Sequence, residues 1–135
     1  MHVQGRRQKN LVLILAREFA SKLATPMFVA DAEGNLVFFN EPAEMLTGRT
    51  FAESGEMPVD QWAELLQIAA VDGSPLPFNE RPVGIALLER REAHAVLRLT
   101  SVDGVQRTIA VTAFPLFARE EQLAGVVTIF WEQPR

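Results

Sequence analysis

The stretch TPMFVADAEGNLVFFN, at residues 25–40, contains two short hydrophobic runs on either side of a turn. The runs are Met27 to Ala30 and Asn35 to Phe39, and apolar runs of this length between turn signals are typical of strands. The four residues between them end in Gly34, and glycine most easily adopts the backbone of a tight turn. The stretch therefore predicts a β-hairpin.

We expect a short helix directly after the hairpin. Asn40 is a preferred N-cap, and Pro42 is tolerated in a first helical turn, where the amide hydrogen lacks a partner anyway. Gly48 suits the end of this helix. Residues 49–58 are expected to be irregular.

Two further helices are expected in the middle of the chain. Asp60 is a candidate N-cap of the first helix, and the second runs from about Arg81 to Arg91 with Asn79 as a candidate cap. Proline and glycine at residues 72–77 predict an extended connection between the two helices.

Upstream of the hairpin, residues 11–23 have apolar side chains at the three- and four-residue spacing of an amphipathic helix. Its main stripe is Val12, Leu15, Ala16, Phe19 and Leu23. Leu11, Leu13 and Ile14 make the apolar surface wider than one contact requires. We therefore expect the helix to cover a sheet and to meet a partner chain, with Val12, Leu15 and Phe19 at a dimer interface.

The last third of the chain predicts three strands. Ala95, Leu97 and Leu99 alternate with His94, Val96 and Arg98. Asp103-Gly104 is a strong hairpin signal, and residues 106–114 alternate again. Residues 125–131 are apolar on both faces, so that something must cover each side of this strand. The fold class is therefore α+β, with a five-stranded antiparallel sheet and short helices on one face.

Composition limits what the chain can do. Its 135 residues fit one domain, its net charge of -4 argues against nucleic-acid binding, and without cysteine it has no disulfide or thiolate nucleophile. The longest apolar run, residues 11–16, is too short for a membrane span or a signal peptide. No acid–base constellation or metal motif is recognisable. We therefore expect a cytoplasmic protein that is not an enzyme.

Several motifs, taken in order, resemble those of PAS domains. Residues 25–40 resemble the opening hairpin, and Ala43, Leu46 and Gly48 resemble the helix that follows it. Asp72-Gly73-Ser74-Pro75-Leu76-Pro77, with Pro82 and Ala86-Leu87, is similar to a stretch of many bacterial PAS sequences. The segments around Asp103-Gly104, Ala113-Phe114-Pro115-Leu116 and 125–129 resemble the closing strands.

The resemblance implies a five-stranded sheet of order 2-1-5-4-3 around a central cavity, and a role in sensing a small molecule, light or redox state. It also implies dimerisation through the N-terminal helix. We therefore divide the chain into a flanking helix unit at 1–24, whose first ten residues are expected to be frayed, and a sensor domain at 25–135. Glu132-Gln133-Pro134 replaces the usual closing motif, so a lone sensor and a module of a longer protein with an output partner are both open.

Several ligand classes can be weighed from the residues. A flavin–cysteinyl adduct and a Tyr- and Cys-based chromophore are excluded, because both residue types are absent. A haem ligand is disfavoured, since His94 shares a strand face with Arg98 and not with Leu97. Non-covalent flavin stays open without a supporting motif. An anion sensor is disfavoured because the stripes expected to point inward are uncharged.

These stripes define the candidate ligand-binding residues: Met45, Leu46, Trp62, Leu65, Leu66, Val83, Ala86, Leu87, Leu97, Leu99, Ile109 and Val111. They predict a small apolar ligand, fatty-acid-like or another hydrophobe, with no cofactor or metal. The same stripes fit a filled core equally well. The alternative is therefore a ligand-free module for dimerisation or protein interaction.

Overall fold

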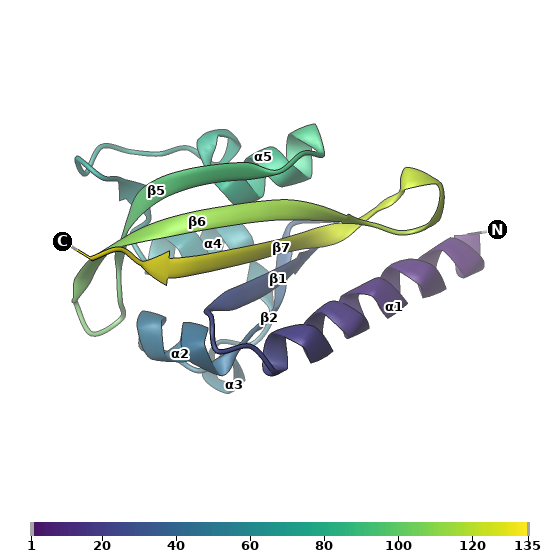
Figure 1. Cartoon of the computed structure of the whole chain (residues 1–135), viewed down its shortest axis with the longest axis horizontal. Coiled ribbons are helices and arrows are strands. Elements are labelled where there is room, and N and C mark those ends of the chain that lie inside the picture. The colour runs from purple at the N-terminus through teal and green to yellow at the C-terminus, as the bar shows by residue number, and fades with distance from the viewer. Residues whose placement is uncertain (1, 135) are drawn as a thin grey trace.

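The computed structural model describes residues 2–134 and shows one sheet with helices on both of its faces (Figure 1). Its helices and helical turns are α1 (His2–Ser21), α2 (Glu41–Thr47), α3 (Phe51–Ser54), α4 (Val59–Leu65), η1 (Phe78–Glu80), α5 (Pro82–Glu89) and η2 (Arg119–Glu121). Its strands are β1 (Met27–Asp31), β2 (Asn35–Phe39), β3 (Met57–Pro58), β4 (Ala69–Ala70), β5 (Ala93–Thr100), β6 (Gln106–Phe117) and β7 (Leu123–Glu132).

The sheet corrects the expected strand count and order. Within residues 2–134 it has seven strands in the order β3-β2-β1-β7-β6-β5-β4, and not five. The five predicted strands keep the order 2-1-5-4-3 among themselves, and the full order differs because a further strand is added at each edge. All described neighbours pair antiparallel. The additional strands, β3 and β4, have two residues each and lie at the two edges. Strands this short left no alternating pattern from which the sequence could predict them.

The hairpin predicted at residues 27–39 is confirmed as β1 and β2. Asp31 Oδ1 accepts hydrogen bonds from the backbone amides of Glu33 and Asn35, at 3.0 and 2.9 Å, and Gly34 has a φ of +85°. The aspartate side chain thus holds the turn, and glycine supplies its left-handed residue.

Asn40, at the end of β2, is confirmed as the N-cap of α2 and does more than cap. Its Oδ1 accepts from the amides of Ala43 and Met27, and its Nδ2 donates to the carbonyls of Ala20 and Thr25, all within 3.1 Å. One buried amide side chain therefore joins α1, the connection after it, β1 and α2.

The helices differ from the sequence expectations at their ends. α1 begins at His2 and not at Leu11, since residues 2–10 contain no proline and the helix continues through Gly5; Met1 lies outside the described residues. α4 has Pro58 and not Asp60 as its N-cap. α5 is capped by Arg81 and not by Asn79, which lies in η1.

The segment expected to be irregular, 49–58, contains α3 and β3. The Thr50 side chain accepts from the Glu53 amide, and the Glu53 carboxylate accepts from the Thr50 amide. This reciprocal capping box stabilises a helix of one turn, which is too short to show a hydrophobic period.

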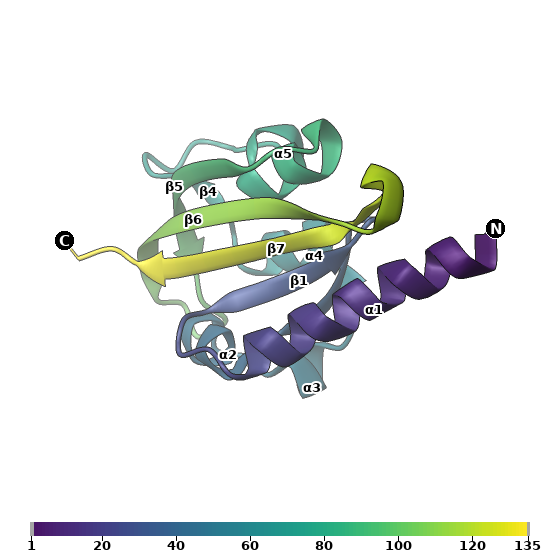
Figure 2. The same cartoon turned by 45° about the vertical axis from the view of Figure 1, so that its right-hand side comes forward.

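Two hydrophobic clusters lie on opposite faces of the sheet. The inner cluster lies between the sheet and α2 to α5, and the outer cluster lies between the sheet and α1. Figure 2 shows α1 running obliquely across the outer side of β1 and β7. The expectation that the N-terminal helix covers the second face of the last strand is confirmed.

The side of α1 that contacts the sheet differs from the expected stripe. Leu13, Ala16 and Ala20 pack in the outer cluster, whereas Leu15 and Phe19 point away from it and are 60% and 59% exposed. Small residues at 16 and 20 bring the helix backbone close to the sheet. The sequence did not show which side of the helix faces the sheet, because apolar residues occupy more of its surface than one contact requires.

Candidate functional site

The inner cluster contains a cavity of about 60 Å³. Its walls are the inner faces of β5, β6 and β7 on one side and α4, with the start of α5, on the other. The inner side chains of the strands alternate with outer ones, so that Leu97, Ile109 and Phe130 reach the cavity from three neighbouring strands. The cavity is the candidate functional site.

The structure brings seven of the twelve predicted ligand-binding residues together around this cavity: Trp62, Leu66, Val83, Leu97, Leu99, Ile109 and Val111. The other five lie elsewhere. Leu46, Ala86 and Leu87 pack in the inner cluster without lining the cavity. Met45 and Leu65 are 76% and 43% exposed and were wrongly placed, because α2 and α4 are turned so that these positions face outward.

Eight lining residues were missed by the sequence analysis: Phe28, Val59, Ala63, Ile68, Arg81, Pro82, Thr128 and Phe130. A signal existed for some of them. Phe130 was expected on one face of its strand with Val126, and Val59 and Ala63 share a helical face with Trp62. Ile68 and Arg81 lie outside regular elements, where no period applies.

Trp62 closes the cavity from the helix side. Its ring stacks on Phe39, with 5.1 Å between ring centroids, and meets Phe28 edge-on at 5.0 Å. Aromatic pairs in these arrangements add about 0.5–1.5 kcal/mol beyond their buried area. Trp62 therefore forms a fixed wall that also belongs to the core.

Arg81 is the charged residue among the lining side chains, and its guanidinium group is paired with a carboxylate. Its Nε donates to the carbonyl of Leu76 at 2.9 Å, and its Nη1 lies 3.0 Å from the Asp60 carboxylate. The Arg81 side chain is 15% exposed, whereas that of Asp60 is 63% exposed. This pair joins η1 and α5 to α4 at the edge of the cavity.

Thr128 is the polar lining residue from the sheet. It is 1% exposed, and its hydroxyl oxygen has no hydrogen-bond partner among the described residues. Its strand neighbours Val127 and Ile129 face α1, so that Thr128 faces inward between Val126 and Phe130. A buried hydroxyl without a partner is costly, which makes this position unusual.

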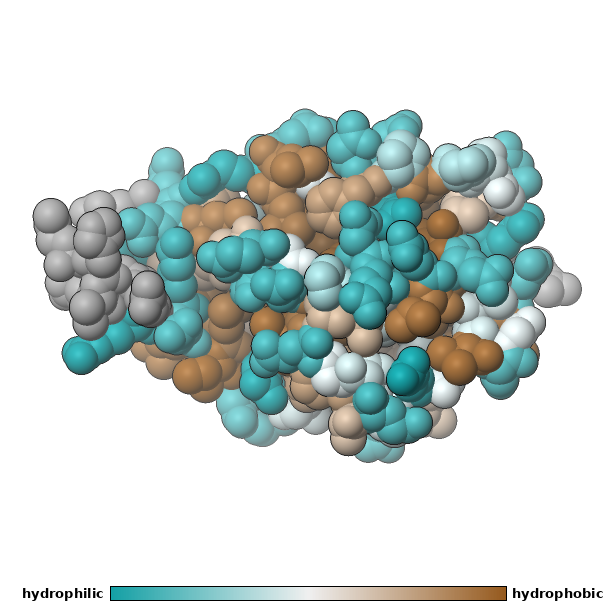
Figure 3. All heavy atoms as spheres, turned by 180° about the vertical axis from the view of Figure 1, so that it is seen from behind, coloured by the Kyte–Doolittle hydropathy of each residue, from teal (hydrophilic) through white to brown (hydrophobic). Residues whose placement is uncertain are grey.

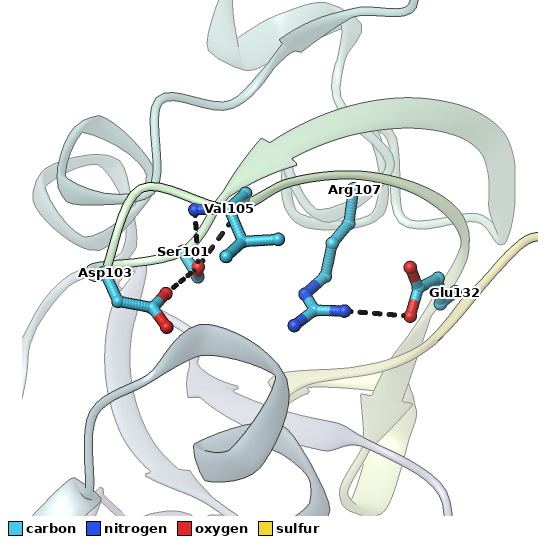
Figure 4. A network of polar contacts seen from close by, with 5 residues as sticks. All are labelled: Ser101, Asp103, Val105, Arg107 and Glu132. Carbon is cyan, nitrogen blue, oxygen red and sulfur yellow. Dashed lines mark hydrogen bonds and ion pairs between the residues drawn. The ribbon is translucent and has the colours of Figure 1, made fainter.

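A polar network lies at the end of the inner face where β6 begins and β7 ends (Figure 4). Arg107 Nη1 lies 3.0 Å from the Glu132 carboxylate, and in the adjacent hairpin turn the Ser101 hydroxyl donates to the Asp103 carboxylate. This hydrogen bond holds the pKa of Asp103 below its ordinary value. The network fastens the ends of the strands that line the cavity.

His94 lies on the outer face of β5, as its alternation with Leu97 predicted. It is exposed, and its Nδ1 is 2.9 Å from the Thr112 hydroxyl across the strand pair. It is therefore not positioned to ligate a group bound in the cavity.

The exposed side of α1 is a second candidate surface. Between residues 7 and 21, four large apolar side chains are more than half exposed on it: Leu11, Ile14, Leu15 and Phe19. Seen from behind, hydrophobic surface extends on the side of the molecule where α1 lies (Figure 3). Of the predicted dimer residues, Leu15 and Phe19 belong to this exposed face, whereas Val12 is half-buried. No helix within residues 2–134 is long and apolar enough to span a membrane.

Comparisons with known proteins place this architecture. No family model matches the sequence, and no curated protein matches it. Among solved structures, the chain is similar to a PAS domain from Colwellia psychrerythraea (17% identity, TM-score 0.64, covering 90% of this chain and 97% of that one). It is also similar to the Rhodobacter sphaeroides LOV protein (16%, 0.69, 94% and 68%) and to the LOV domain of the blue-light activated histidine kinase EL346 from Erythrobacter litoralis (18%, 0.65, 84% and 100%).

Proposed function

We propose that this chain, which has the PAS fold, is a sensor domain that binds a small apolar ligand in the cavity between β5–β7 and α4. The observation that carries the proposal is the cavity itself, which is lined almost entirely by apolar side chains from the sheet and the helices. A ligand there would be held by the apolar surface it removes from water, at about 25 cal/mol per Å².

The size of the cavity limits which ligands can bind in it. A cavity of about 60 Å³ exceeds the roughly 10–15 Å³ that one water needs and is smaller than the roughly 150 Å³ cavity that holds benzene, so it accepts a few non-hydrogen atoms. A fatty-acid chain or a flavin would have to extend beyond the cavity or require the helices to open. Among the apolar ligands expected from the sequence, the small hydrophobe therefore fits best.

β7 offers a route from the cavity to the outside. Phe130 lines the cavity, and Val127 and Ile129 on the same strand pack against the α1 side. We infer that ligand binding favours one packing of α1 on the sheet over another, which is how a ligand shifts a two-state equilibrium. α1 would pass this change to a second copy or an output protein through its exposed face.

A dimer through α1 is part of the proposal. Its support is the row formed by Leu11, Leu15 and Phe19, which recur every four residues on the exposed side of the helix. Contiguous exposed apolar surface of this kind typically marks an interaction site. We propose that the domain works in the cytoplasm and has no catalytic activity of its own.

The second candidate function is a ligand-free module for dimerisation or protein interaction. It is favoured by the density of the inner cluster, in which Trp62, Phe28 and Phe39 fill the space beside the cavity. In this case the exposed face of α1 would be the functional surface, and the cavity would be a packing defect.

Ligand binding and self-association together distinguish these functions. Native mass spectrometry of the purified protein shows whether a molecule co-purifies, and thermal unfolding with 1-butanol and 2-butanone shows whether the cavity accepts one. The sensor proposal expects a raised melting temperature and a changed dimer dissociation constant in sedimentation experiments.

A variant with a filled cavity provides the matched control. Ala63→Val adds two carbon atoms on the α4 wall of the cavity, and Ala52→Val adds them at an exposed position of α3. Ligand response should disappear in the first variant and persist in the second. An empty wild-type protein that responds to none of these compounds would favour the ligand-free module, and a protein that stays monomeric at high concentration would exclude the dimer.

A further inference from the structure

Thr128 gives the cavity a polar anchor. It borders the cavity from β7, it is almost completely buried, and its hydroxyl oxygen has no partner within residues 2–134. The backbone groups of β7 are engaged with β1 and β6, so they do not supply one. The methyl and hydroxyl groups of threonine exchange places on rotation about χ1, and the open space beside this residue is the cavity.

We propose that the ligand is a small neutral compound of a few non-hydrogen atoms that carries one carbonyl or hydroxyl group, which hydrogen-bonds to Thr128. The inference rests on the proposed function and names the class of ligand for the same cavity. Binding through buried apolar area alone would not distinguish molecules of equal size. A single hydrogen bond to Thr128 would favour those that carry a polar group.

The neutrality of the ligand follows from the charges at the site. Arg81 is paired with Asp60 and also donates to the Leu76 carbonyl. Its positive charge is therefore already balanced at the edge of the cavity. A carboxylate inside would lie among apolar side chains without a cation of its own, and a buried ion without a partner is strongly disfavoured.

The stability of the ligand-free protein gives a second argument for Thr128 as a binding residue. A valine at 128 would fill the same volume without an unpaired hydroxyl, since the two side chains have almost the same shape. Removing the hydroxyl should therefore raise the stability of the ligand-free protein. A hydroxyl kept at a cost to the empty state is what a binding contact requires.

The test compares three proteins and three probes. The proteins are wild type, Thr128→Val and Thr128→Ser, and the probes are 2-butanone, pentane and butyrate, titrated by NMR. In wild type, the affinity for 2-butanone relative to pentane should be about five-fold higher than the same ratio in Thr128→Val, which corresponds to one net hydrogen bond. Thr128→Ser should keep the ratio of wild type. Butyrate should bind most weakly.

The melting temperature of the ligand-free proteins gives an independent readout, and that of Thr128→Val should exceed that of wild type. Equal ratios in wild type and Thr128→Val would overturn the inference while leaving the sensor function intact, because pentane would still bind. Tighter binding of butyrate than of 2-butanone would overturn the neutrality of the ligand. Failure of all three probes to bind the wild type would instead contradict the proposed function.

Discussion

Among single residues, Asn40 has the most consequential position in this domain. Its side chain satisfies two backbone donors and two backbone acceptors from four different parts of the chain. An unsatisfied buried polar group costs about 1–3 kcal/mol, and these costs are not fully additive. The end of α1, the start of β1 and the start of α2 therefore depend on one amide.

We expect Asn40→Ala to lower the free energy of unfolding by about 3–5 kcal/mol, because backbone groups in four parts of the chain each lose a hydrogen bond. Urea denaturation measures the effect. Asn35→Ala is the matched control: its side chain makes one long hydrogen bond, of 3.4 Å, to Asp31, and it should cost less than about 1 kcal/mol. Equal losses in the two variants would contradict this role of Asn40.

Gly84 lies where α5 passes close to η1. A Cβ atom at this position would lie 1.8 Å from the carbonyl oxygen of Phe78. Helix propensity alone predicts that Gly84→Ala stabilises the protein by about 1 kcal/mol. We expect the opposite sign, a loss of about 1–3 kcal/mol or more, because the backbone has to move.

Gly104→Ala is the comparison for this prediction. Gly104 has a φ of +90°, but an added Cβ there meets no atom within 4 Å. Its loss should be limited to the strain of a left-handed residue, about 1 kcal/mol. Chemical denaturation of both variants measures the two losses of stability. A Gly84→Ala variant more stable than wild type would show that η1 can move away from α5 at little cost.

Ser101 and Asp103 provide a prediction on pH. The hydrogen bond from Ser101 lowers the pKa of the Asp103 carboxyl, so the folded state binds this proton less readily than the unfolded state does. The resulting stabilisation is present above the unfolded pKa and is lost as the pH falls through the lower, folded pKa. NMR titration should show that Ser101→Ala raises the pKa of Asp103, whereas Ser74→Ala leaves it unchanged.

At the scale of elements, α1 has two apolar sides with different roles. Leu13 lies on the sheet side, close to Gly125 of β7, whereas Leu15 and Phe19 are exposed. The outer cluster needs the first side for folding, and the proposed partner would bind the second. Substitutions on the two sides should therefore separate stability from association.

We expect the double substitution Leu15→Lys with Phe19→Lys to abolish self-association in sedimentation experiments and to change the free energy of unfolding of the monomer by less than about 1 kcal/mol. Leu13→Lys should instead destabilise the monomer by several kcal/mol, because it places a charge in the outer cluster. A double variant that still dimerises would show that the partner binds elsewhere.

The elements also show what the sequence could predict. The hairpin at β1 and β2, the cap at Asn40 and the two-faced β7 were predictable, because turn residues, caps and alternation are local signals. The orientation of α1 was not, since Leu13 and Leu15 are equally apolar and the choice depends on the close approach that Ala16, Ala20 and Gly125 allow. β3 and β4 exist only because longer strands lie beside them.

The cavity could be predicted only in part for the same reason. Four of the seven residues found correctly belong to the long alternating strands β5 and β6, namely Leu97, Leu99, Ile109 and Val111. Met45 and Leu65 were misplaced because α2 and α4 have seven residues each, and a helix of two turns does not determine from its pattern which way it faces. Thr128 was missed because a threonine within a strand carries no sign that its hydroxyl lacks a partner.

For the whole molecule, the question is whether the cavity is space reserved for a ligand. Ala63→Val extends into it from α4, and Ala52→Val adds the same atoms in solvent. Relative to the second variant, we expect the first to gain about 1 kcal/mol of stability, since burying a methyl group contributes about 0.8 kcal/mol. Differential scanning calorimetry measures the difference. A loss of stability would mean that the wall is already fully packed.

The two hydrophobic clusters share one wall, because β7 presents Val126, Thr128 and Phe130 to one and Val127 and Ile129 to the other. This arrangement has a consequence for how such a domain diversifies. Under the proposed function, mutations at the inward positions would change which ligand is bound, while the outward positions that contact α1 stay the same. A new ligand specificity could therefore evolve without any change in the residues of β7 that contact α1.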